Sequence, residues 1–434
     1  MSNNNSGELI FIHLGECGCQ IGKSIWDLFC NTEFKSNTYQ LFEESIRKEN
    51  TFTSRSLFID SDSNIIDHNT FTQQIRLTHC ENKLKYCCKQ ENIINDYESS
   101  ITSLRSQFSF GNNYINYIEE RIRKMVENCD HLDGIIFTHS IGGGTGSGMI
   151  CRILEQLRSK SWLKGVTISS FSVFPSLSEM ASSTTFELYN MVLSMETMRE
   201  YLSNISSIRN DLIYDYCKYE LKIENIEYNT INQVISQMIS TFLEPCLFSN
   251  ESFSQISSKL VPYPSMNIIS NSLMSIRNNL DCKELFSNQY SLTIDGIDNA
   301  KSISTCISMR GTDFYNINKD SIANYLNHRK LIYQNVFNSQ RNIGNACKLF
   351  NSNNIVHIAN NSTGVRNNLE QYLKLFDTNF KKYTYIQKYV LEGLADGEFE
   401  QARENLESYI DDYKELDRDY IYNIIHKKKY PFFN

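Results

Sequence analysis

The glycine-rich stretch at residues 140–148 (SIGGGTGSG) constrains the fold of this chain more than any other segment. Five of the seven residues at 142–148 are glycine, an apolar stretch precedes them at 134–141, and apolar residues at helical spacing follow at 149–157. Successive glycines let backbone N–H groups point at one anion, and the positive end of the following helix adds to the attraction. We therefore predict a phosphate-binding loop between a buried strand and a helix; a merely flexible glycine turn is the alternative.

This glycine run differs from the two commonest nucleotide-binding loops. A Walker loop requires Lys after its last glycine, where this chain has Met149, and the dinucleotide motif GxGxxG requires Gly at the position of Ser147. The sequence therefore disfavours a dinucleotide-dependent dehydrogenase, and it gives little support to a self-sufficient GTPase.

Strand-like and helix-like segments alternate through the first half of the chain, which is typical of a doubly wound parallel sheet. Such sheets bind ligands in loops at the carboxyl ends of their strands. The predicted fold class is therefore α/β. Short apolar strands are predicted at 9–14, 57–59 and 134–141, and helical spacing indicates helices at 21–29, 113–129 and 149–157.

The second half of the chain contains a break that indicates a domain junction. Residues 190–245 are predicted to be helical, and Pro262 and Pro264, two of the five prolines in the chain, end this pattern. A further strand is predicted at 302–309. The predicted domains are an N-terminal doubly wound nucleotide-binding domain at 8–245, an intermediate α/β domain at 246–380 and a C-terminal helical hairpin at 381–434.

A long helix with a continuous apolar stripe is predicted near the C-terminus. Apolar residues from Phe399 to Tyr420 recur at steps of three and four, so the stripe must pack on another surface. We expect it to pack on its own domain; a coiled-coil seam is the alternative.

Composition excludes several functional classes. The chain has 42 Lys and Arg against 50 Asp and Glu, so it offers no basic face to nucleic acid. It contains no run of about eighteen apolar residues and no leader-like N-terminus, so we expect an intracellular protein that does not bind membranes. The 13 cysteines include no CxxC pair and are expected to be reduced thiols.

Together with other segments, the glycine run resembles the signature of the tubulin and FtsZ GTPases. Residues 9–28 (LIFIHLGECGCQIGKSIWDL) resemble the first strand, loop and helix of tubulins, and 260–264 (LVPYP) and 309–311 (MRG) resemble two further tubulin segments. Residues 397–404 (GEFEQARE) are similar to an alpha-tubulin helix. The resemblance spans residues 8–425 and favours the alpha class over the beta and minor classes.

This resemblance implies GTP or GDP with Mg²⁺ as ligands. It implies a beta-tubulin-like partner, both in a heterodimer and in a polymer, and a place in the cytoplasmic cytoskeleton, in microtubules that include ciliary or spindle arrays. A tubulin homologue that binds GTP but does not polymerise, and instead acts as a regulatory or interaction module, is the alternative.

The resemblance also implies a role for individual residues of a nucleotide site. Asp60 and Asp62 would lie near the magnesium ion, where two carboxylates can supply oxygen ligands; a solvated acidic turn is the alternative. Asn95 would lie near the terminal phosphate. The phosphates would be held by Gly15, Glu16, Cys17 and Gln20 of the first loop and by Ser140, Gly143, Gly144, Thr145 and Gly146 of the glycine run.

The remaining residues of the implied site would hold the nucleoside. Ser183 and Glu187 match the loop that binds ribose. Asn210 and Asn232 match the pair that reads the guanine edge, to which an amide can both donate and accept, and Tyr228 matches the aromatic residue that stacks on the base.

The chain departs from the tubulin pattern at the position that carries a catalytic acid in alpha-tubulins. Alpha-tubulins carry a Glu that acts on the nucleotide of the next subunit, and this chain has Gln255 at that position. An amide cannot accept a proton from water, so we expect impaired activation of the neighbour and little or no intrinsic GTPase activity. Glu251 is an alternative acid.

Two further departures concern charge. Glu16 stands where the family has Gln, so we expect nucleotide binding to depend more strongly on Mg²⁺. The chain ends in a basic segment at 427–434 (KKKYPFFN) instead of a long acidic tail. We therefore expect no binding by motors that depend on such a tail.

Overall fold

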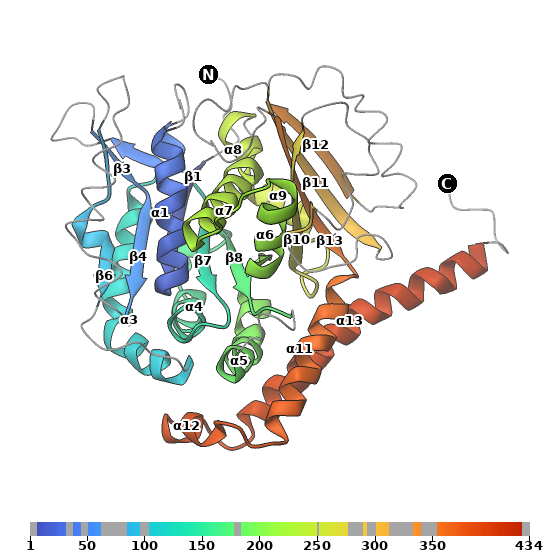
Figure 1. Cartoon of the computed structure of the whole chain (residues 1–434). Coiled ribbons are helices and arrows are strands. Elements are labelled where there is room, and N and C mark those ends of the chain that lie inside the picture. The colour runs from blue at the N-terminus through green and yellow to red at the C-terminus, as the bar shows by residue number, and fades with distance from the viewer. Residues whose placement is uncertain are drawn as a thin grey trace.

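The computed structural model describes residues 7–31, 38–44, 51–61, 85–95, 104–177, 184–249, 251–276, 290–292, 301–311, 333–339 and 354–427. A ten-stranded sheet runs through these residues in the order β12-β11-β13-β10-β9-β8-β7-β1-β4-β6 (Figure 1). The strands are β1 (Glu8–Leu14), β4 (Ser56–Asp60), β6 (Ile93–Asn95), β7 (Leu132–Ser140), β8 (Thr167–Phe174), β9 (Asn204–Arg209), β10 (Ile268–Ile276), β11 (Ser302–Arg310), β12 (Tyr333–Ser339) and β13 (Asn354–Ser362).

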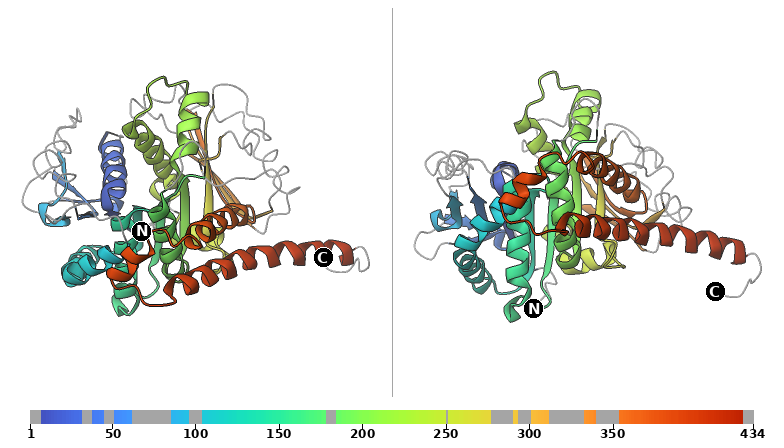
Figure 2. Two further views of the ribbon diagram at one scale, coloured as in Figure 1. Left: turned by 60° about the horizontal axis from the view of Figure 1, so that its bottom comes forward. Right: turned by 90° about the horizontal axis from the view of Figure 1, so that it is seen from below.

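Helices cover both faces of this sheet, which confirms the predicted α/β class (Figures 1 and 2). Neighbouring strands in the part β10-β9-β8-β7-β1-β4-β6 of the sheet are parallel. The strand β13 pairs antiparallel with both β10 and β11. The helices are α1 (Gly15–Asn31), α3 (Leu104–Glu127), α4 (Gly144–Arg158), α5 (Thr185–Tyr201), α6 (Asn210–Asp215), α7 (Tyr228–Phe242), α8 (Glu244–Phe248), α9 (Phe253–Leu260), α11 (Val365–Phe380), α12 (Ile386–Leu391) and α13 (Glu398–Lys427).

The two faces of the sheet bury two separate apolar clusters. Side chains alternate between the faces along each strand. In β1, Leu9 and Phe11 therefore join the cluster under α1 and α7, whereas Ile10, Ile12 and Leu14 join the cluster under α3, α4 and α5. The predicted strands at 9–14, 57–59, 134–141 and 302–309 are all confirmed.

The strand β9 corrects the prediction that residues 190–245 are helical throughout. Its sequence, NISSIR, lacks the apolar run that marks the other central strands. Its buried serines are satisfied by the next strand instead, because Ser206 bonds to the Asn271 side chain and Ser207 donates to the carbonyl of Ile269. The strand also pairs with β10, so one sheet continues across the predicted boundary at residue 245.

The apolar stripe of α13 packs within the chain. Phe399, Leu406 and Tyr413 are buried in the same cluster as α5 and α11, which both contact α13. The stripe therefore packs within the chain and not in a coiled coil. Its partners α5 and α11 precede residue 381, so the expectation that it packs on its own predicted domain at 381–434 was wrong. The C-terminal part of α13 extends beyond the rest of the described chain (Figure 2). Among the described residues, no helix is long and apolar enough to cross a membrane.

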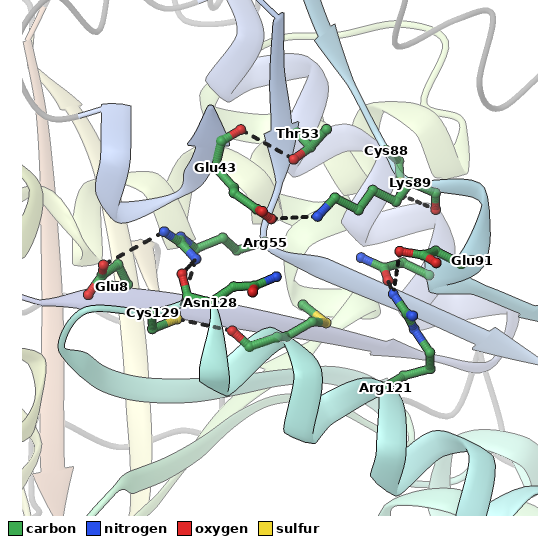
Figure 3. Close-up of polar contacts among 12 residues, drawn as sticks. Glu8, Glu43, Thr53, Arg55, Cys88, Lys89, Glu91, Arg121, Asn128 and Cys129 are labelled. Carbon is green, nitrogen blue, oxygen red and sulfur yellow. Dashed lines mark hydrogen bonds and ion pairs between the residues drawn. The ribbon is translucent and has the colours of Figure 1, made fainter. Parts of the chain in front are cut away.

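Buried arginines attach α3 to the edge of the large sheet, beside a small second sheet. The small sheet has the order β2-β3-β5, from β2 (Phe42–Glu44), β3 (Thr51–Ser54) and β5 (Lys85–Cys87). Arg55 lies 3.7 Å from Glu8 and donates to the carbonyl of Asn128, and Arg121 pairs with Glu91 at 2.9 Å (Figure 3). These contacts join elements that are far apart in sequence, so we assign them a structural role.

Candidate functional site

A cleft of about 500 Å³ lies at the carboxyl ends of β1, β4, β7 and β8. In the sheet order, β1 lies between β7 and β4. The chain adds β4 and β6 on one side of β1 and β7 and β8 on the other, and ligands usually bind where the strand order reverses in this way. Its lining consists of Leu14, Gly15, Glu16, Cys17, Gln20, Asp60, Ser61, Ser140, Gly143, Gly144, Thr145, Gly146, Val173, Glu187, Asn210, Tyr228 and Asn232.

Two helix N-termini meet at this cleft. The helix α1 begins at Gly15 directly after β1, and α4 begins at Gly144, four residues after the end of β7 at Ser140. The first N–H groups of a helix have no partner within it, and the N-terminal end of the helix dipole is positive. The arrangement therefore suits an anionic group that both helices contact.

The helix α4 begins inside the glycine run, which corrects the prediction of an open loop over residues 140–148. Residues from Gly144 onward are helical, and the next turn is anchored by buried Met149 and Ile150. A Cβ on Gly146 would lie 2.6 Å from the carbonyl oxygen of Ser140, so this glycine is required for the helix to approach the strand end. On Gly143, the nearest atom would be 3.6 Å away.

A polar group at the end of β4 faces the glycine run. The hydroxyls of Ser61 and Thr145 are 3.0 Å apart, and the Ser61 amide donates a 2.7 Å hydrogen bond to Asp60, which is 2% exposed. A carboxylate with adjacent hydroxyls, completed by phosphate oxygens and water, suits Mg²⁺. In the described residues, no cluster of three or more His, Cys, Asp or Glu side chains could hold a metal ion by itself.

Of the other residues predicted for this site, Asn95 is described and does not line the cleft, whereas two lie outside the described residues. Asn95 pairs in register with Asp60 across β6 and β4, but it does not line the cleft. Asp62 lies outside the described residues, as does Ser183 of the predicted ribose loop. Ser61 was not predicted; its only signal was its position in the polar run at 60–64 directly after a strand.

The far end of the cleft offers an aromatic face and two amides. Tyr228 and Asn232 lie one turn apart at the start of α7, and Tyr228 is 72% exposed. Asn210 begins α6, and its buried Oδ1 accepts no hydrogen bond from the described residues. An aromatic ring beside amide donors and acceptors suits the face and edge of a nucleobase.

The remaining polar side chains of the cleft are Glu16, Cys17, Gln20 and Glu187. The Gln20 amide donates a 3.0 Å hydrogen bond to the exposed Glu16 carboxylate. Burial, aided by the charge of Glu16, raises the pKa of Cys17 to about 12, so this residue stays a thiol. Burial also raises the pKa of Glu187 above its usual value, against the effect of hydrogen bonds from Thr184.

Gln255 lies beyond the amino end of β7, whereas the cleft lies at the carboxyl end of that strand. It is an exposed residue in the first turn of α9, whose N-terminal end is held by Asp133: both Ser252 Oγ and the Phe253 amide donate to this carboxylate. Asp133 is near the start of β7, and Ser140 ends the same strand. At about 3.3 Å per residue the two are separated by roughly 23 Å, so Gln255 cannot act on the cleft of its own chain.

Glu251, the alternative acid, lies near thiols of its own chain. Burial raises the pKa of Cys246 well above its usual range, and the charges of Asp133 and Glu251 add to the shift. Glu251 is half-buried, whereas Gln255 is exposed.

Comparison with known proteins identifies the class that this fold and cleft define. Residues 8–218 match the Tubulin/FtsZ family, GTPase domain. The chain is a divergent relative of the alpha-tubulins over nearly its whole length. It is 27% identical to the tubulin alpha-3 chain of Saccharomyces cerevisiae, over 95% of this chain and 98% of that one, and 28% identical to the tubulin alpha chain of Pneumocystis carinii, over 98% and 100%. It is also 28% identical to the tubulin alpha-6 chain of Naegleria pringsheimi, over 94% and 95%.

Proposed function

We propose that the chain is a GTP-binding structural subunit of microtubules or of a specialised tubulin polymer, alpha-tubulin-like, with impaired trans-activation of GTP hydrolysis. The observation that carries this proposal is the placement of the cleft and of Gln255 at opposite ends of β7. When subunits stack end to end, the cleft of one faces the α9 end of the next. A residue at position 255 would then meet a nucleotide held by the neighbouring subunit.

In this proposal the glycine run and the start of α1 hold the phosphates. Backbone N–H groups at Gly144, Thr145 and Gly146 would bind them together with groups at Gly15, Glu16 and Cys17. Asp60 and the Thr145 hydroxyl would hold Mg²⁺, which neutralises phosphate charge when bound. Asn95 would approach the terminal phosphate from the strand beside Asp60.

The other end of the cleft would hold the nucleoside. Tyr228 would stack on the base, and Asn210 and Asn232 would bind the guanine edge. Glu187 would contact the ribose. Because Gln255 can orient a water but cannot remove its proton, we propose that the neighbouring subunit retains GTP longer and that the lattice containing it is unusually stable.

The proposed partner is a beta-tubulin-like subunit, and the proposed location is the cytoplasmic cytoskeleton. Support comes from relatives that are named alpha-tubulins and that match the chain over nearly its whole length. The division into domains at 8–245, 246–380 and 381–434 is part of the same proposal.

Copurification tests the proposal most directly. The chain is isolated from its natural cell, the bound nucleotide is identified by chromatography after denaturation, and the associated subunit is identified by mass spectrometry. We expect GTP or GDP together with a beta-tubulin. Pelleting with beta-tubulin then separates a polymer subunit from a homologue that binds GTP without polymerising. A folded protein that retains no guanine nucleotide and associates with no tubulin would contradict the proposal.

A further inference from the structure

A buried asparagine connects the glycine run to the C-terminal helices. Nδ2 of Asn190, on α5, donates a 2.9 Å hydrogen bond to the carbonyl oxygen of Gly142, and Oδ1 accepts a 2.7 Å hydrogen bond from the hydroxyl of Tyr389, on α12. Asn190 and Tyr389 are both 0% exposed. Because both ends of the amide are bonded in an interior without competing water, its two partners fix its orientation.

The carbonyl that Asn190 holds sets the direction of an amide at the cleft. The peptide bond between Gly142 and Gly143 is planar and trans, so its N–H points away from its carbonyl oxygen. With the carbonyl directed at Asn190, the Gly143 N–H is directed at the Ser140 hydroxyl, which lies 3.3 Å from it and lines the cleft. Rotation of this peptide would turn the amide away from the cleft.

Side chains pack closely against Gly142. A Cβ on Gly142 would lie 3.0 Å from the Cβ of Glu187 and 3.2 Å from the ring of Pro175. The Tyr372 hydroxyl, from α11, bonds to the carbonyl of Pro175 at 2.5 Å. The back of the glycine run is therefore held by side chains from α5, α11 and α12.

The other end of this connection lies beside an exposed apolar surface. Tyr389 packs against Tyr189 of α5 and Phe399 of α13, with ring centroids 5.7 and 5.3 Å away. The next two residues of α12, Val390 and Leu391, are 50% and 88% exposed. A contact that moves α12 would therefore act on the same tyrosine that holds Asn190.

We propose that Asn190 is a positioning residue for the phosphate-binding loop and that Tyr389 couples this loop to α12. Occupancy of the cleft then changes the packing of α12, and displacement of α12 changes anion affinity at the cleft. The identity of the anion as GTP rests on the proposed function, whereas the positioning of the loop does not.

Tyr389→Phe is the main test variant because it removes one hydroxyl and keeps the aromatic packing. Asn190→Ala removes both hydrogen bonds. The chain also offers a matched control: the Tyr409 hydroxyl of α13 donates to Oδ1 of buried Asn267, whose Nδ2 donates to the carbonyl of Leu202 at 2.7 Å. Tyr409→Phe therefore removes an equivalent buried hydroxyl that does not contact the cleft.

Hydrogen exchange of the ligand-free full chain measures positioning. Tyr389→Phe is expected to speed exchange over residues 141–148 at least about threefold relative to wild type, whereas Tyr409→Phe leaves it unchanged. Equal exchange over 141–148 in the two variants would overturn the proposal, including the case in which both lose the same stability.

Nucleotide binding measures the coupling. We expect GTP to slow exchange over residues 386–391 in wild type and in Tyr409→Phe, but not in Tyr389→Phe. GTP affinity should fall about tenfold in Tyr389→Phe and in Asn190→Ala. Unchanged affinity and unchanged protection in Tyr389→Phe would overturn the coupling. If wild type binds no GTP while the exchange over 141–148 responds as expected, the proposed function fails and the positioning role stands.

Discussion

The backbone amide of Phe253 donates a 2.6 Å hydrogen bond to Oδ2 of Asp133, which fixes the first turn of α9 to the amino end of β7. The carboxyl end of the same strand, at Ser140, faces the cleft. A single strand thus connects the proposed nucleotide site to the surface that carries Gln255. The two ends of a subunit can meet only across a contact between subunits.

Gln255→Glu is expected to restore a general base at that contact. Polymers assembled with beta-tubulin and this variant should release phosphate about 100-fold faster than wild-type polymers, the lower range of general-base effects. The measurement is phosphate release per polymerised dimer. Gln255→Ala is the control and should release phosphate no faster than wild type; equal rates for all three chains would rule out a catalytic consequence of this position.

Gly146→Ala is expected to disrupt the cleft, because its Cβ would lie 2.6 Å from the carbonyl oxygen of Ser140. The free energy of unfolding should fall by about 1–3 kcal/mol, and the purified protein should retain less nucleotide. Gly143→Ala is the matched control for the free energy of unfolding, since its Cβ would meet no protein atom closer than 3.6 Å and its backbone is extended. Urea unfolding of both variants and the nucleotide content of Gly146→Ala are measured. Equal loss of stability in the two variants would show that the clash is not the cause.

Glu16→Gln is expected to make nucleotide binding less dependent on magnesium. Glu16 lines the cleft and is exposed, so its charge would repel phosphates unless Mg²⁺ screens it. Removal of Mg²⁺ should lower GTP affinity about tenfold more in wild type than in Glu16→Gln. Titrations with and without Mg²⁺ measure this difference. Glu404→Gln, at an exposed position on α13, should behave like wild type; the same magnesium dependence in Glu16→Gln would end the idea.

His13 is expected to make stability depend on pH. Burial lowers the pKa of His13 to about 3, and its ring is fixed between Trp26, which donates to Nε2, and Thr138, which accepts from Nδ1. Only the unfolded state takes up a proton near pH 6.5, so stability falls as the pH drops from about 6.5 toward 3.

His13→Gln should flatten this dependence. Urea unfolding between pH 6.5 and 5 should show a slope smaller than that of wild type by at most about 1.4 kcal/mol per pH unit. His139 and His357, whose pKa values burial lowers to about 4 and 3, keep their own contributions. Between pH 7 and 8 the two proteins should have equal slopes, and a difference there would point to another group.

Sequence patterns predicted the parts of the fold that apolar side chains specify. The strand at 9–14 and the stripe from Phe399 are dense in apolar residues, and both lie where periodicity placed them. The helix predicted over the residues of β9 was wrong. Ser206 and Ser207 of this strand bond to residues of β10, and no local sequence pattern shows that contact. The predicted start of the helix at residue 149 was wrong for a similar reason. The helix α4 begins at Gly144, because tertiary packing overrides the low helix propensity of glycine.

The candidate site could be predicted where the residues are tied to strand ends. Asp60, Ser140 and Thr145 meet because the carboxyl ends of parallel strands share one edge. The connection from Gly142 through Asn190 to Tyr389 could not be predicted, because its members lie 48 and 199 residues apart and neither Asn190 nor Tyr389 belongs to a chemical motif.

The pairing of Ile268 and Ile269 with β9 has a mechanical meaning. Strand pairing continues from β6 at one edge of the sheet to β12 at the other, so residue 245 does not separate two independent sheets. A bend of the chain at this boundary would have to break the backbone pairing between β9 and β10.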